Sequence, residues 1–179
     1  MRQFYYGLAL FIFLALPPIR MLFESIMVMH MHMQMMLLFI AGWLMGKFVN
    51  QKLIKAHRYN TTGMPGLIIF IFLFIYWMLP RAMDEALEYP LVEAFKFVSI
   101  PLIGMLFRDS MAKLNHNKKF IIYTCIAITF SILAYFYIFS ETTLCNNYLE
   151  SDQLAVGYGF IFIAISVVLL MFIQIKDSK

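Results

Sequence analysis

Residues 26–46 read IMVMHMHMQMMLLFIAGWLMG and contain no Asp, Glu, Lys or Arg. A helix that crosses a bilayer needs about 20 predominantly apolar residues, and this stretch supplies them without a charged interruption. Its first half is also an unusual mixture of methionine and histidine. We therefore predict a membrane-spanning helix over residues 26–46 and interpret the rest of the chain outward from it.

The composition of the whole chain agrees with a membrane protein. Of 179 residues, 63% are hydrophobic and only 13% are charged, whereas soluble domains are roughly 45–50% apolar and about 25% charged. The residues outside the apolar stretches are scattered over short loops and termini, which leaves no room for a separate soluble domain. The net charge of +4 indicates membrane orientation and not nucleic-acid binding.

Five other apolar stretches are bounded by charges, prolines or polar clusters. Together with the first they predict an all-α integral membrane protein, a six-helix transmembrane bundle in a single domain over residues 1–179. The predicted spans are 4–22, 26–46, 64–79, 91–107, 120–139 and 154–175. The first is expected to be a retained helix, because Leu16-Pro17-Pro18-Ile19-Arg20 at its exit contains no small-x-small cleavage site.

The basic residues indicate the orientation of this bundle. One side would carry Arg2, Lys47, Lys52, Lys55, Arg58, Arg108, Lys113, Lys118, Lys119, Lys176 and Lys179, and the other side only Arg20 and Arg81. The positive-inside rule then places both termini in the cytoplasm. We expect the protein to lie in the cytoplasmic (inner) membrane, with the lipid bilayer as its first partner. The opposite side would be acidic, with Glu24, Asp84, Glu85, Glu88, Glu141, Glu150 and Asp152.

The methionine and histidine run is the best candidate for a functional site. Thioether sulfur is a soft ligand and imidazole a borderline one, so the mixture favours copper, in particular Cu(I). On a regular helix His30 and His32 point about 160° apart, so one ion cannot use both. One face would carry His30 with Met27, Met33 and Gln34, and the other His32 with Met29, Met35 and Met36. The candidate metal ligands are His30, His32, Met29, Met33 and Met36.

Polar residues near this run are candidates for a supporting role. Gln34 lies within it, and Asp84, Glu93 and Asp152 fall at the outer ends of three other predicted spans. A metal-ligating imidazole usually donates its second N–H to a carboxylate or a carbonyl. We therefore predict that at least one of these carboxylates lies within hydrogen-bonding reach of His30 or His32. Glu93 is also three residues from Lys96 and could pair with it instead.

Other interpretations stay open from these residues alone. The methionines could be packing surface between helices, with the histidines hydrogen-bonded across an interface. A haem with an unusual His/Met axial pair or a transporter is also compatible with the pattern. Cys145, in a polar loop, is either an ordinary thiol or a further soft ligand, and we expect it not to form a disulfide with Cys125. No catalytic triad, phosphate-binding loop or zinc-protease motif is present, so the chain is not expected to be an enzyme or to bind nucleotides.

Three segments resemble the cytochrome c oxidase assembly factor family CtaG, which is associated with caa-type oxidases. They are the His-Met helix start from His30 to Leu38, the proline-containing exit Leu79-Pro80-Arg81-Ala82-Met83-Asp84-Glu85-Ala86-Leu87 that leads into an aromatic helix over residues 93–107, and Asp152-Gln153-Leu154-Ala155-Val156-Gly157. The sequence departs from the family at one position. Four residues after His30 and His32 stand Gln34 and Met36, where the family has a second histidine.

This resemblance implies a membrane copper chaperone or assembly factor for a haem-copper oxidase or another copper membrane enzyme. It would act on the extracytoplasmic side and would transfer Cu(I) without turning over a substrate. The alternative is a non-catalytic accessory subunit of a respiratory or copper-dependent membrane complex, in which the methionine and aromatic residues are packing surface.

Overall fold

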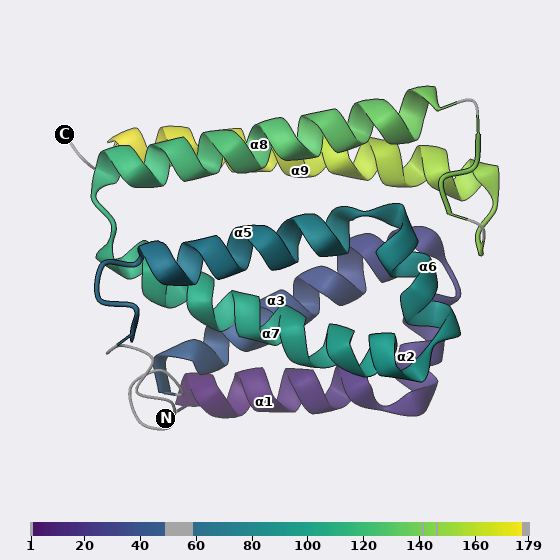
Figure 1. Ribbon diagram of the computed structural model, residues 1–179, viewed down its shortest axis with the longest axis horizontal. Coiled ribbons are helices and arrows are strands. Elements are labelled where there is room, and N and C mark those ends of the chain that lie inside the picture. The colour runs from purple at the N-terminus through teal and green to yellow at the C-terminus, as the bar shows by residue number, and fades with distance from the viewer. Residues whose placement is uncertain (1, 49–58, 141, 146, 177–179) are drawn as a thin grey trace. The chain divides into compact units, whose positions relative to one another are not determined.

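The structure, a computed structural model, describes residues 2–48, 59–140, 142–145 and 147–176, where helices are the only regular secondary structure. The helices are α1 (Arg2–Ala15), α2 (Pro17–Glu24), the π-helix η1 (Met29–Gln34), α3 (Met35–Phe48), α5 (Met64–Met78), α6 (Pro80–Glu88), α7 (Pro90–Lys113), α8 (His116–Phe139) and α9 (Glu150–Lys176) (Figure 1). They form two compact units, unit 1 (Met1–Lys113) and unit 2 (Leu114–Lys179). Outside the described residues lie the predicted loop residues Lys52, Lys55, Arg58 and Glu141, and Lys179.

Two breaks at proline bend the chain within unit 1. α1 and α2 meet at 72°, and α5 and α6 meet at 75°. The residue before each proline is extended, with ψ of 129° at Leu16 and 128° at Leu79. A proline ring disfavours the helical conformation in the residue that precedes it. The predicted first span, residues 4–22, is therefore broken at Leu16 instead of running as one continuous helix.

Three helices are long and apolar enough to cross a membrane, and among the described residues this number rises to five if each bent pair forms one span. The three are Pro90–Lys113, His116–Phe139 and Ser151–Ile173. They fall on the last three predicted spans. The predicted span 26–46 is helical over residues 27–48, with η1 interrupting the regular α-helix. The all-helical fold with membrane-length helices is confirmed, while the six spans and the single domain stay predictions.

In unit 1, α3 packs against α1 and α7, and α7 also contacts α5 and α6. Glycines bring α3 and α7 together. A β-carbon on Gly42 would overlap the backbone carbonyl of Pro101, and one on Gly104 would overlap that of Phe39. In lipid, van der Waals contact between backbones is a main attraction between helices, and small residues make that contact close.

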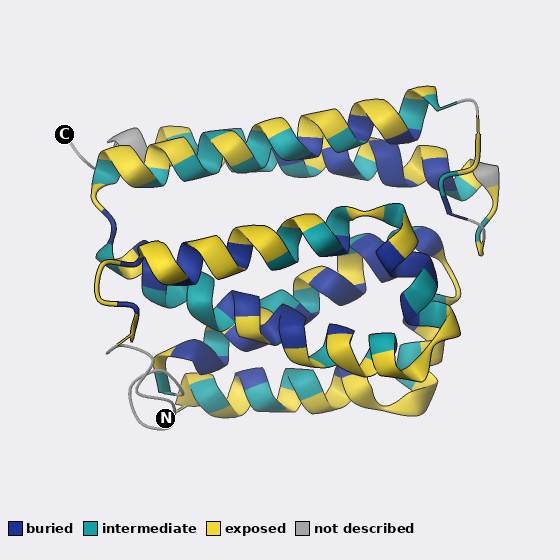
Figure 2. Ribbon diagram, in the orientation of Figure 1, coloured by how far each residue is buried: buried dark blue, intermediate teal, exposed yellow. Residues whose placement is uncertain are grey.

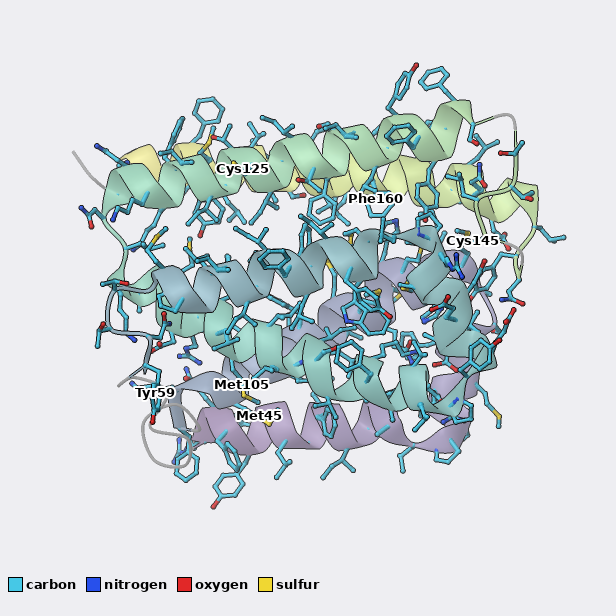
Figure 3. The ribbon with its side chains drawn as sticks, viewed as in Figure 1. Met45, Tyr59, Met105, Cys125, Cys145 and Phe160 are labelled. Carbon is cyan, nitrogen blue, oxygen red and sulfur yellow. The ribbon has the colours of Figure 1, made fainter. Side chains whose placement is uncertain are left out.

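The burial pattern follows from this contact. Figure 2 shows buried residues in the middle of α7 and on α3, whereas much of the remaining helix surface is exposed. Met45 and Met105, labelled in Figure 3, belong to this packed region, where a β-carbon on Gly46 would lie 3.0 Å from the Cα of Met105. Large apolar side chains such as Phe72 and Leu91 are exposed, which suits a surface in contact with lipid.

Polar contacts tie four helix ends together at one end of unit 1. Arg108, near the end of α7, donates to the carbonyl of Trp43 at 2.7 Å and to Gln3 Oε1 at 3.2 Å. Asn60, before α5, donates through Nδ2 to Ser110 Oγ at 3.0 Å. The start of α1, the end of α3, the start of α5 and the end of α7 therefore lie together, so these four helices alternate in direction.

Unit 2 is a pair of long helices, α8 and α9, that pack along each other. The rings of Phe130 and Phe160 stack with their centroids 5.7 Å apart. The connection is held by Gln153, which accepts from the Leu144 N–H at 2.8 Å and donates to the carbonyl of Tyr137 at 3.3 Å. This glutamine therefore links Leu144 of the connection to the end of α8.

The close approach of α3 and α7 predicts that Gly42→Ala destabilises unit 1. The β-carbon would meet the backbone of Pro101, and such overpacking costs about 1–3 kcal/mol, more than the gain of about 1 kcal/mol in helix propensity. Gly46→Ala is the matched control, because its β-carbon would only lie 3.0 Å from the Met105 Cα. Both tryptophans, Trp43 and Trp77, lie in unit 1, so the thermal transition of their fluorescence in mild detergent measures the effect. A Gly42→Ala midpoint at or above that of Gly46→Ala would contradict the prediction.

Candidate functional site

Lys96 of α7 carries a charged side chain that has no solvent exposure. Its Nζ lies 2.6 Å from Glu24 Oε1, 3.1 Å from His30 Nε2 and 3.3 Å from Gln34 Oε1. An ammonium group has three N–H donors and no acceptor, so these three contacts use its full hydrogen-bonding capacity. Because the ammonium can only donate, His30 must accept through Nε2 and carry its own proton on Nδ1.

The three acceptors come from two elements that are distant from Lys96 in the sequence. Glu24 is the last residue of α2, while His30 and Gln34 lie in η1. His30 and Gln34 are both fully buried. The ammonium thus joins the bent α1–α2 segment, the π-helix and α7 at a single point inside unit 1.

A second ion pair covers this buried group. Arg20 Nη1 lies 2.7 Å from Glu93 Oε1, and Arg20 Nε lies 3.9 Å from Glu24 Oε2. The side chains of Arg20, Glu24 and Glu93 are 32%, 13% and 17% exposed, against 0% for Lys96. The side chains of the polar network therefore become more buried from Arg20, which is partly exposed, to Lys96, which is fully buried. Its two cationic and two anionic groups balance, as buried charges within a span generally require.

Several buried polar atoms of the network make no hydrogen bond to the described residues. They are Gln34 Nε2, Arg20 Nε and Glu93 Oε1. The close contact between Arg20 and Glu93 is therefore an ion pair without hydrogen-bond alignment at that oxygen. Buried groups of this kind commonly bind ordered water, so the network is able to take up further polar partners.

Trp77 and Ser99 form a second polar contact beside Lys96. Trp77 Nε1 donates to Ser99 Oγ at 2.8 Å, and Ser99 donates to the carbonyl of Phe95 at 2.6 Å. Both side chains are buried, with 1% exposure. Because Ser99 lies three residues after Lys96, this contact fixes α5 against the same turn of α7.

The methionine and histidine run contains the π-helix η1. The N–H of Met35 bonds to the carbonyl of His30, five residues earlier, whereas a regular α-helix bonds four residues back. His30 and Gln34 stay together, as predicted, because both contact Lys96.

Two of the other predicted companions change sides, while Met27 is buried as His30 is. Met33 was expected beside His30, yet it is 48% exposed, and Met35 was expected beside His32, yet it is only 5% exposed. The buried methionines are Met27, Met31 and Met35, while Met29 and His32 are half-buried and Met33 and Met36 are exposed. We call the residues Met29, His32, Met33 and Met36 the Met–His face. It holds four of the five predicted metal ligands and separates them from the fifth, His30.

The carboxylates that were predicted to support the histidines are Asp84, Glu93 and Asp152, and the structure gives Glu93 a different partner. Glu93 pairs with Arg20, so neither it nor Lys96 forms the predicted local pair, and Lys96 binds Glu24 instead. Asp84 is buried in α6, and Asp152 begins α9 in unit 2. A contact of Asp84, Glu93 or Asp152 with one of the two imidazoles stays a prediction. Arg20 and Glu24 were missed as site residues, although their position at the end of an apolar run was a signal.

No cluster of three or more His, Cys, Asp or Glu side chains in the described part of the chain is arranged to hold a metal ion. Methionine is not among those ligand types, so the Met–His face stays a candidate. Cys145 is 3% exposed, with its sulfur 4.0 Å from the Tyr137 hydroxyl. Both cysteines are free thiols, Cys125 exposed on α8 and Cys145 in the α8–α9 connection (Figure 3).

Comparisons with protein-family models, with curated proteins and with solved structures gave no match to this chain. The interpretation of the site therefore depends on its own geometry and chemistry.

The buried network predicts a large and non-additive effect of Glu24→Gln. The substitution leaves the Lys96 ammonium without its nearest carboxylate, and breaking a buried pair in this way costs about 3 kcal/mol. Replacing both charges, with Glu24→Gln and Lys96→Leu, should recover much of that loss, because an apolar pair avoids the desolvation of two ions. The readout is again the thermal transition of tryptophan fluorescence.

The matched control is Glu85→Gln. Glu85 pairs with Arg81, whose side chain is 88% exposed, and exposed pairs contribute little. Two results would contradict the prediction that the buried Lys96–Glu24 pair contributes this stability. One is similar destabilisation by Glu24→Gln and Glu85→Gln. The other is a double variant, Glu24→Gln with Lys96→Leu, that is as unstable as the sum of its single changes.

Proposed function

We propose that this chain is a multi-pass integral membrane protein that binds Cu(I) on the Met–His face and transfers it to a membrane oxidase or another copper-dependent membrane enzyme. The observation that carries the proposal is the burial pattern of the run, in which Met29, His32, Met33 and Met36 are all at least partly exposed. A transfer protein needs ligands that a client can reach, and this arrangement provides them.

The ligand types of the Met–His face suit Cu(I). Thioether and imidazole are neutral, and soft sulfur ligands select Cu(I) over the hard cations that prefer carboxylate oxygen. Transfer would occur by ligand exchange, with no substrate turned over, so the protein is not proposed to be an enzyme. Its partners would be the lipid bilayer and the client complex, with no role for nucleic acid or nucleotides.

In the proposed topology the protein crosses the inner (cytoplasmic) membrane six times, and both termini lie in the cytoplasm. Each bent pair would count as one span, and residues 27–48 would form another. The helix ends that gather around Arg108 and Asn60 also carry Arg2, Lys47 and Lys113, and the positive-inside rule places such an end in the cytoplasm. The Met–His face then belongs to the outer half of the bilayer.

The resemblance to the CtaG family supports the same proposal. The segments that carry it include the histidine and methionine run and the Leu79-Pro80-Arg81 exit. In unit 1 both segments lie at the end opposite to Arg108, since α5 and α3 run in opposite directions. A copper site at this end would serve the maturation of an oxidase on the extracytoplasmic side.

The topology predicts opposite accessibility of two introduced thiols. In a Cys125→Ser, Cys145→Ser background, Ser25→Cys should react with a membrane-impermeant maleimide added to intact spheroplasts, and Lys47→Cys should react only after lysis. Both positions are exposed, and they lie near opposite ends of the helical segment over residues 27–48. Labelling of Lys47→Cys in intact spheroplasts would refute a cytoplasmic location for this end.

The copper proposal predicts that the purified protein binds Cu(I) and that the Met–His face supplies the ligands. His32→Ala, and the pair Met33→Leu with Met36→Leu, should each weaken Cu(I) binding by roughly tenfold or more, as the loss of strong metal ligands does. Met27→Leu with Met31→Leu is the control, because both of these methionines are buried. Affinity is measured in detergent by competition with a coloured Cu(I) chelator.

Equal affinity of the wild type, the face variants and the buried-methionine control would overturn the assignment. If the protein binds no Cu(I) and is always recovered at a fixed ratio with the other subunits of a larger membrane complex, the accessory-subunit alternative is favoured.

A further inference from the structure

We propose that Glu24, His30 and Gln34 form a cation site filled from within by the ammonium of Lys96, and that Lys96 thereby keeps metal away from His30 and confines it to His32. The first half stands on the Lys96 contacts alone. The second half rests on the proposed Cu(I) function. Lys96 is thus a specificity-determining residue that touches no metal itself.

The geometry of the three acceptors is that of a cation site. A carboxylate oxygen, an imidazole nitrogen and an amide oxygen point at one atom, at 2.6, 3.1 and 3.3 Å. His30 and Gln34 have no solvent exposure, so water cannot replace the ammonium freely. Three convergent acceptors in a buried position are stable only around a positive charge or a donor.

The same donor set would suit a metal ion. Imidazole with carboxylate and amide oxygen is a familiar set for borderline divalent cations. The amide of Gln34 also has a buried Nε2 without a hydrogen bond to the described residues, so only its oxygen is committed. What prevents this use in the native chain is that the Nε2 lone pair of His30 already accepts from Lys96.

The charge of Lys96 adds to this steric and hydrogen-bonding block. A second cation at about 4 Å from the ammonium would also be repelled by its charge, which the Glu24 carboxylate offsets in part. Lys96 has little freedom to withdraw, because its turn of α7 is fixed by the contact between Ser99 and Trp77. Copper would therefore meet the half-buried His32 before the fully buried His30.

The test compares Lys96→Leu, which removes the charge and introduces no ligand, with Lys96→Arg, which keeps a cation. Co²⁺ is the probe for the vacated site, because its visible absorption reports inner-sphere ligands, and Cu(I) is the probe for the Met–His face. Lys96→Leu is expected to gain a Co²⁺ site that disappears when His30→Ala is added. The wild type and Lys96→Arg should show at least tenfold weaker Co²⁺ binding, insensitive to His30→Ala. Cu(I) binding by the wild type should depend on His32 and not on His30.

A folded Lys96→Leu protein with no His30-dependent Co²⁺ site would overturn the cation-site inference, as would His30-dependent metal binding by the wild type. If the wild type binds no Cu(I) but Lys96→Leu gains the His30-dependent Co²⁺ site, the proposed function fails while the cation site stands.

Because Lys96→Leu could fail to fold, a second measurement uses the wild type. In a ¹⁵N-histidine NMR spectrum, His30 should show the tautomer with its proton on Nδ1, and its signals should not move when Cu(I) is added, whereas those of His32 should. The signals are assigned with His30→Gln and His32→Gln. Movement of the His30 signals on adding Cu(I), or the opposite tautomer, would overturn the proposal.

Discussion

The burial of the Lys96 ammonium is the constraint on which the rest of unit 1 depends. Removing a charge from water is costly, and the cost is met only when partners of opposite charge and good geometry surround it. Here the partners come from α2 and η1, through Glu24, His30 and Gln34. The bend before Pro17 is what lets α2 turn back to place Glu24 there. A straight first helix would carry that carboxylate away from α7.

The π-helical turn is linked to the same constraint. Its wide hydrogen bond, from the Met35 N–H to the His30 carbonyl, occurs where two neighbouring side chains, His30 and Gln34, both reach Lys96. π-Helical turns are rare and are often found at functional sites, because they adjust side-chain directions that a regular helix fixes. In this chain the methionine run that contains the π-turn has a buried stripe and a partly exposed Met–His face.

Features that depend on local rules could be predicted from the sequence, and those that depend on distant contacts could not. The membrane-length helices follow from uninterrupted apolar length, and the end of the predicted span 64–79 follows from Pro80. The bend before Pro17 obeys the same local rule but was not predicted, since residues 4–22 were expected to form one helix. The spacing of Gly42 and Gly46 also signals a close helix contact. The partner of Lys96 was out of reach, because local spacing suggested Glu93 whereas the structure uses Glu24, 72 residues away. Met33 and Met35 were assigned to the wrong faces because each lies about 60° around a helix from the histidine with which it was grouped, at the boundary between the buried and the exposed side.

The neutrality of the network has a consequence for the proposed selectivity. Arg20 and Lys96 balance Glu24 and Glu93, so the buried side of η1 presents no net charge to the Met–His face. A net negative interior would attract hard divalent cations to this face in preference to a monovalent soft ion. With a neutral interior and neutral ligands, the choice of metal depends on ligand softness, which favours Cu(I). The Lys96 ammonium satisfies His30 and Gln34 within the core, and under the proposed function it would also cancel the carboxylate charge that attracts hard cations to the Met–His face.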